Sequence, residues 1–127
     1  DVDGRVIGQR NSPARAAINR TLPFKNCFIH PTVMARRKKI VEVGGYNAGF
    51  NSEDYDLWLR LRRIGVIWEN MPDALLDYRV HNSASQGRLL GYAEVGGLAL
   101  RELLVTKRPI WMLAIFLAIA KALIKGR

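Results

Sequence analysis

The chain carries the stretch NSEDYDLWLRL at residues 51–61, and this stretch decides the fold of its surroundings. Its apolar side chains recur at helical spacing, because Leu57, Leu61 and Ile64 share one face with Trp58 beside them. The acids stand at the front, where the helix dipole favours negative charge, and the arginines follow at the end that favours positive charge. We therefore expect an amphipathic helix with a buried stripe.

Both ends of this helix have recognisable signals. We expect the side chain of Asn51 or Ser52 to cap the free amides of the first turn. Gly65 can close the helix in a left-handed conformation, which glycine adopts without strain. The acids Glu53 and Asp54 have two interpretations: they stabilise a solvated helix end, or they are catalytic carboxylates held at a helix N-terminus.

The composition is that of an ordinary small domain, with 127 residues, 49% of them hydrophobic and 24% charged. The net charge of +9 favours an anionic partner such as nucleic acid, phosphate groups or a membrane surface. The single cysteine, Cys27, excludes an internal disulfide and a cysteine-based metal site and indicates a buried thiol in a reducing compartment. The chain opens at Asp1 without a methionine or a signal peptide, so we expect a fragment of a longer protein.

Short β-rich segments and helices alternate along the first two thirds of the chain. We expect strands at 5–8, within 25–34, at 66–68 and at 74–81. We expect further helices at 12–20, 34–43, 85–105 and 110–124. The strand at 74–81 alternates, which places Asp77, Arg79 and His81 together on a polar face that could line a site.

Four motifs occur in order: HPTVM at 30–34, VGGY at 43–46, EDYDLWLR at 53–60 and LLDYRVH at 75–81. In this order and spacing, residues 1–86 resemble the C-terminal half of the catalytic domain of family 2 glycosyltransferases, a large inverting class with the GT-A fold. The resemblance implies an α/β fold class, as a mixed α+β fragment of that fold with a helix-rich C-terminus. Residues 87–127 would form a C-terminal helical extension whose last helix is apolar and basic.

The resemblance also implies roles for single residues. Asp54 would be the catalytic base that takes a proton from the acceptor hydroxyl, and Glu53 would orient it or contact the acceptor. His81 would lie near the donor diphosphate or its metal. Arg79 could pair with phosphate or with Asp77.

Two further motif residues have a structural and a functional interpretation. His30 either supports the acceptor pocket or is a hydrogen-bonded core histidine. Trp58 either stacks on a sugar or, as we favour, belongs to the core. Asp1-Val2-Asp3 has the form of a metal-binding motif, but no buried strand precedes it, so we expect the true motif upstream.

The resemblance implies a set of ligands and a place in the cell. A nucleotide-sugar donor, a saccharide or lipid-linked acceptor and a divalent metal, Mn or Mg, are expected in the full-length enzyme, with His81 as the candidate ligand. The product would belong to polysaccharide or glycolipid synthesis. The fragment alone is expected to be inactive, because the nucleotide-binding half is missing. The expected location is cytoplasmic, at the inner face of the membrane.

Two other classes of function compete with this interpretation. A basic nucleic-acid-binding module would explain the charges at 36–39, but the chain has no recognition-helix, zinc or aromatic RNA-binding signature. A membrane-surface module would act through 109–125, where the uncharged run 109–120 reaches only about 18 Å against about 30 Å of hydrocarbon. Uncovered strand edges and apolar faces also favour a homo-oligomer.

Overall fold

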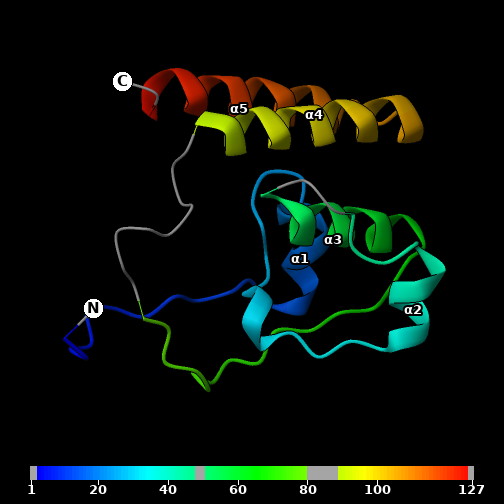
Figure 1. Cartoon of the computed structure of the whole chain (residues 1–127). Coiled ribbons are helices and arrows are strands. Elements are labelled where there is room, and N and C mark those ends of the chain that lie inside the picture. The colour runs from blue at the N-terminus through cyan, green and yellow to red at the C-terminus, as the bar shows by residue number, and fades with distance from the viewer. Residues whose placement is uncertain (1–2, 48–50, 80–88, 126–127) are drawn as a thin grey trace.

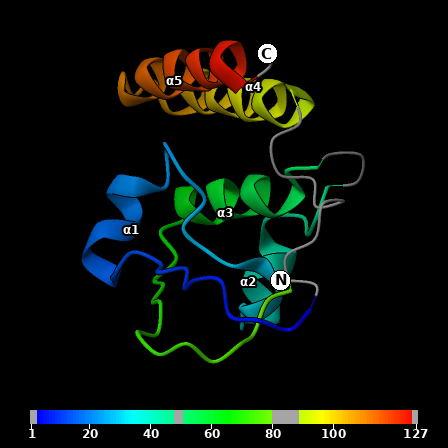
Figure 2. The same ribbon diagram turned by 90° about the vertical axis from the view of Figure 1, so that its left-hand side faces the viewer.

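The computed structural model describes residues 3–47, 51–79 and 89–125, which form helices joined by loops (Figure 1). The elements are α1 (Arg15–Thr21), the 3₁₀ turn η1 (His30–Thr32), α2 (Arg37–Glu42), α3 (Glu53–Arg63), α4 (Leu89–Thr106) and α5 (Ile110–Lys125). α3 lies at the centre, with α1 and α2 beside it. α4 and α5 form an antiparallel hairpin that lies over α3 in both views (Figure 1, Figure 2).

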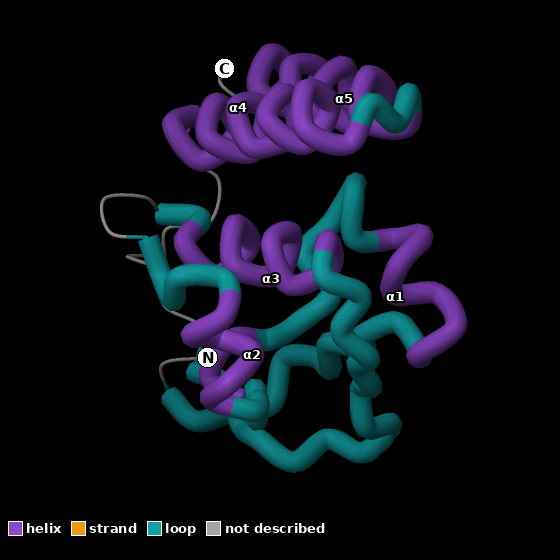
Figure 3. The backbone as a smooth tube through the Cα atoms, turned by 90° about the vertical axis from the view of Figure 1, so that its right-hand side faces the viewer, coloured by secondary structure: helices purple, strands orange, loops and turns teal. Residues whose placement is uncertain are grey.

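The predicted α/β fold class is wrong for the described residues, which contain helices and loops but no strand (Figure 3). The segments 5–8, 66–68 and 74–79 are loops, and 25–34 holds η1; the last two residues of the predicted strand, 80–81, lie outside the described part. A strand needs a neighbour that exchanges backbone hydrogen bonds with it, and these segments do not pair with one another. Their apolar side chains, such as Val6, Ile67 and Leu75, are exposed.

The buried stripe predicted for α3 is confirmed, because Leu57, Trp58 and Leu61 are all buried. Ile64, the last residue predicted for that stripe, is 39% exposed just beyond the helix. Burial extends all round α3 over residues 55–61, as expected of a helix that is covered on several sides.

Glycine closes α3 as predicted. Gly65 has φ +69°, its N–H donates to the carbonyl of Arg62 at 3.1 Å, and the Val66 N–H donates to that of Leu61 at 3.3 Å. This pair of bonds is the Schellman motif. The predicted N-terminal cap is wrong, because Ser52 holds the cap position without a side-chain bond to the helix.

An ion network joins the hairpin to α3. The carboxylate of Asp56 accepts hydrogen bonds from Arg60 at 2.9 Å, from Asn47 at 2.8 Å and from Arg101 of α4. Arg101 also pairs with Glu102 at 2.9 Å. Asp56 and Glu102 are almost completely buried, so each needs these partners to offset the loss of water.

Apolar packing supports the same junction. Ala99 of α4 and Trp111, Ala114 and Ala118 of α5 are buried in the described structure. The guanidinium of Arg62 lies 5.6 Å from the ring centre of Trp111, a cation–π contact between α3 and α5. The predicted boundary between residues 1–86 and 87–127 stays a prediction.

Burial by itself raises the pKa of Asp56, but hydrogen bonds from Arg101 and Arg60, with their positive charges, outweigh it. The pKa of this carboxyl therefore lies below its usual value. A carboxyl with a lowered folded-state pKa stabilises the fold above its unfolded pKa, and this contribution is lost as pH falls through the folded pKa.

Replacing Asp56 should destabilise the protein strongly. Asp56→Ala leaves the buried guanidinium of Arg60 without its carboxylate, so we expect the free energy of unfolding to fall by about 3–5 kcal/mol. Denaturant unfolding of the complete protein measures this. The control is Glu42→Ala, which breaks an exposed pair with Lys39 and should cost less than about 1 kcal/mol. Equal losses in both variants would contradict the importance of the network.

The lowered pKa of Asp56 predicts that the free energy of unfolding depends on pH in the acidic range. The unfolded pKa of an aspartate is about 3.9, so the free energy of unfolding should fall steeply as pH drops from about 5 to about 2. Asp56→Asn removes the titrating group and should show a shallower loss over this window. Parallel pH profiles for the two proteins would show that another group governs acid unfolding.

Candidate functional site

The two acids at the start of α3, Glu53 and Asp54, are both partly buried, and Asp54 lines a pocket of about 310 Å³. The walls come from the loop 23–26, from the start of α3 at 51–55 and from the hairpin helices α4 and α5. A volume of this size is at the lower end of the range for small-molecule sites. The structure thus places the predicted base in a concave site.

Two hydrogen bonds fix the carboxylate of Asp54. The side-chain amide of Asn26 donates to one oxygen at 2.9 Å, and the backbone N–H of Tyr55 donates to the other at 2.6 Å. Asn26 is itself oriented, because its own oxygen accepts from the Phe28 N–H at 3.1 Å. Sequence reasoning missed Asn26, since nothing local marks a residue that meets its partner 28 positions later.

His30 lies beside Tyr46, with 2.9 Å between the His30 Nε2 and the Tyr46 hydroxyl. Burial raises the pKa of Tyr46, and the negative charges of Asp54 and Glu53 raise it further. The phenol therefore stays protonated near the two acids at neutral pH. The structure brings His30 close to the site through Tyr46, whose VGGY motif was noted in the sequence without a role.

Trp58 is 3% exposed and meets Phe28 edge to face, with 5.2 Å between ring centres. It also lies 6.2 Å from the ring of His30. The structure places Trp58 in the core, and its role as a sugar platform stays a prediction. Arg79 is exposed in a loop and does not line the Asp54 pocket. His81 lies outside the described residues.

No group of three or more His, Cys, Asp or Glu side chains within the described residues could hold a metal ion. Asp56 is already occupied by Arg60 and Arg101. Described residues alone thus do not fit the expected divalent metal, which stays a prediction together with His81 as its ligand. Cys27 is not a candidate metal ligand, since burial raises the pKa of its thiol to about 11 and only the thiolate binds metal well.

Two lysines line the Asp54 pocket from opposite ends of the chain. Lys25 precedes Asn26 in the loop, and Lys121 belongs to α5. The proximity of these two lysines could not be predicted from the sequence, because it depends on the hairpin folding back over α3. The pocket therefore combines one positioned carboxylate with two exposed ammonium groups and apolar walls from Leu117 and Ala118.

This arrangement suits a particular kind of chemistry. A carboxylate such as Asp54 can accept a proton from a hydroxyl held within hydrogen-bond reach. The ammonium groups of Lys25 and Lys121 can bind an anion beside it. The site can thus activate a hydroxyl on a ligand that carries negative charge.

Comparison with known proteins gives related enzymes from bacteria. The O-antigen biosynthesis glycosyltransferase WbnJ of Escherichia coli is 42% identical over 125 residues, which cover 97% of this chain and 49% of that protein. The amylovoran biosynthesis glycosyltransferase AmsE of Erwinia amylovora is 39% identical over 56 residues, or 44% of this chain and 21% of that protein.

A third relative from Escherichia coli is the UDP-Gal:alpha-D-GlcNAc-diphosphoundecaprenol beta-1,3-galactosyltransferase. It is 32% identical over 76 residues, which are 60% of this chain and 28% of that protein. No family model and no solved structure matches the chain. The chain spans about half the length of WbnJ and less of the other two. It is homologous to bacterial glycosyltransferases.

Proposed function

We propose that the protein containing this chain is an inverting, family 2 glycosyltransferase that transfers a sugar from a nucleotide-diphospho-sugar to an acceptor hydroxyl in polysaccharide or glycolipid synthesis. One observation carries the proposal: Asp54, the acid that matches the family's base, is held by Asn26 in a pocket. The 42% identity to WbnJ, over an alignment that covers 97% of this chain, supports the same class of reaction. The Asp54 site and the alignment to WbnJ both lie within this chain, which spans about half the length of WbnJ.

In the proposed reaction Asp54 accepts the proton of the acceptor hydroxyl as the hydroxyl oxygen attacks the anomeric carbon. The bond from that carbon to the donor diphosphate breaks, and the nucleoside diphosphate leaves with the bonding electrons. A single attack from the opposite face inverts the anomeric configuration. Glu53, next to Asp54 at the start of α3, would orient Asp54 or contact the acceptor.

Positioning must supply much of the rate, because a sugar hydroxyl is a far weaker acid than a carboxylic acid. The hydrogen bond from Asn26 and the hairpin wall above Asp54 provide such positioning. A divalent metal remains part of the proposal for the complete protein, with ligands to be sought outside the described residues.

We further propose that the protein acts at the cytoplasmic face of the membrane, with the hairpin as its contact. Much of the hairpin's surface is apolar and exposed, including Leu104, Met112, Phe116 and Leu123. Several large apolar side chains exposed on one pair of helices are typical of an interaction surface. Lys107 and Arg108 in the turn between the helices suit anionic lipid headgroups. No helix of the described residues has the length and apolarity that crossing a membrane requires.

The first test replaces the proposed base. Asp54→Asn keeps the shape of the side chain and removes its basicity, so turnover should fall by roughly 10² or more while donor binding survives. Steady-state kinetics and a donor-binding titration on the complete protein measure both. The control is Asp73→Asn, in an exposed loop outside the pocket. Turnover of Asp54→Asn within twofold of the wild type would eliminate Asp54 as the base.

The second test concerns the membrane surface. Phe116→Glu puts a charge on the exposed face of α5, where burial of one aromatic side chain is worth about a tenfold change in affinity. We expect weaker flotation of the complete protein with anionic vesicles. Ile67→Glu, at an exposed apolar position outside the hairpin, is the matched control. If both variants float like the wild type, the hairpin is not the contact.

A further inference from the structure

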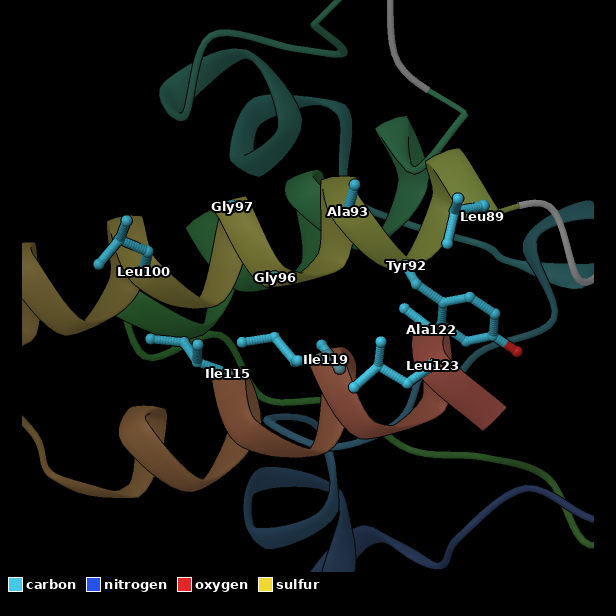
Figure 4. A pocket seen from close by; sticks show the side chains of 11 residues that line it. Leu89, Tyr92, Ala93, Gly96, Gly97, Leu100, Ile115, Ile119, Ala122 and Leu123 are labelled. Atoms are coloured by element: carbon cyan, nitrogen blue, oxygen red, sulfur yellow. The ribbon is translucent and has the colours of Figure 1, made fainter. Parts of the chain in front are cut away.

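Tyr92 of α4 lies where two cavities meet. It lines the Asp54 pocket, and it also lines an apolar groove of about 400 Å³ that runs between α4 and α5. Figure 4 shows its side chain reaching from α4 towards α5, with the hydroxyl pointing away from α4. The hairpin therefore contributes an aromatic ring to the pocket that holds the proposed base.

Three aromatic side chains among the described residues line this pocket, and two of them are used by the core. Tyr55 is buried, and its hydroxyl donates to the carbonyl of Leu22 at 2.7 Å. Phe24 packs against the buried core. Tyr92 is partly exposed and is neither part of the core nor one of the residues packed against it. The ring of Tyr92 is thus the one that a ligand can cover.

Ser52 supplies a polar group to the same pocket. It is buried and holds the N-cap position of α3, where a serine hydroxyl normally accepts a hydrogen bond from the first turn. Here the hydroxyl makes no such bond, and it has no partner in the part of the chain that the structure describes. Because a buried hydroxyl without a partner costs free energy, a ligand group that pairs with it binds more tightly.

A sugar ring has the matching chemistry. The C–H groups on one face of a pyranose form an apolar surface, and its hydroxyls lie around the edge. An aromatic ring can cover that face, while a few placed polar groups bind the hydroxyls. The groove beyond Tyr92 does not offer this combination, because its other lining side chains are apolar and would leave the hydroxyls unpaired (Figure 4). The sugar therefore belongs on the pocket side of Tyr92.

We propose that Tyr92 and Ser52 determine which acceptor sugar the Asp54 pocket accepts. The apolar face of the sugar stacks on the ring of Tyr92, one hydroxyl binds Ser52, and the attacking hydroxyl meets Asp54. This inference rests on the proposed function and adds to it, since it assigns specificity to two residues outside the four sequence motifs, one of them on the hairpin.

The first experiment needs no turnover. Saturation-transfer NMR, with the aromatic protons irradiated, is recorded on the complete protein with the methyl pyranosides of glucose, galactose and mannose. Saturation should reach the ring C–H protons of at least one of them, because those protons lie against Tyr92. Tyr92→Ala should weaken the affinity measured in this way about tenfold, since the stacking surface is lost.

Two further variants control for the hydroxyl and for the helix. Tyr92→Phe keeps the ring and should bind like the wild type. Leu90 is exposed on the same helix and lines neither cavity, so Leu90→Ala is the matched control and should also bind like the wild type. Equal affinities in the wild type and Tyr92→Ala, or no saturation of any of the three sugars in the wild type, would overturn the proposal.

The second experiment measures kinetics with the methyl pyranoside that serves as acceptor. Tyr92→Ala of the complete protein should raise KM for this acceptor about tenfold and leave kcat and KM for the donor unchanged, because the ring holds the acceptor before and during the reaction. A rise in KM for the donor alone would place the donor in this pocket and overturn the acceptor assignment.

Ser52→Ala separates ligand binding from helix stability. Because the hydroxyl makes no cap bond, the denaturant midpoint should stay that of the wild type, while KM for the same acceptor should rise roughly threefold to tenfold. A lower midpoint with an unchanged KM would show that Ser52 serves only the helix, which overturns its role in specificity.

These readouts separate the sugar site from the proposed function. Tyr92-dependent binding of a methyl pyranoside, in a wild-type protein that transfers no sugar, would support the sugar site and refute the reaction. Turnover that depends on Asp54, with an acceptor KM that responds to neither Tyr92→Ala nor Ser52→Ala, would leave the reaction intact and overturn the sugar site.

Discussion

The buried carboxylate of Asp56 is the interaction on which the described structure depends. It faces Arg60 on its own helix and Arg101 on α4, so it holds the centre of the fold and the hairpin together. Because Asp56 is buried, loss of either arginine would leave its charge without compensation and would destabilise the fold. The hairpin is thus seated on α3 in one specific way, and Trp111 packs into the same junction.

That seating creates the candidate site. One wall of the Asp54 pocket is the start of α3, and the opposite wall is the inner side of α4 and α5. Asp54 stands two residues before Asp56 on the same helix, so the network that seats the hairpin also determines where α5 lies relative to the Asp54 carboxylate. The backbone N–H of Asn51 donates to Glu94 of α4 at 3.2 Å and adds a second tie at the same edge.

The sequence predicted the local features of α3 with one exception, the side-chain cap at its N-terminus. The buried stripe of α3 and its closure at Gly65 follow from residue spacing and from the freedom of glycine, and both are confirmed. The strands failed because alternation describes side chains, whereas a strand also needs a neighbouring backbone. Asn26 and Lys121 were missed for a related reason: each reaches Asp54 only after distant segments pack together. Asp54 could be proposed as the base from the sequence, since its motif is contiguous, and that role stays a prediction.

The positively charged side chains of the protein fall into different surroundings in the structure. A net charge of +9 predicts an anionic partner without saying which. The structure separates two parts of that charge: Arg60 and Arg101 pair with Asp56 inside the protein, whereas Lys25 and Lys121 line the Asp54 pocket. Nucleic acid binds to a broad exposed basic surface, whereas two cations that line one pocket suit a small anionic group. The hairpin therefore places Lys121 in the same pocket as the carboxylate that is proposed to act on the acceptor.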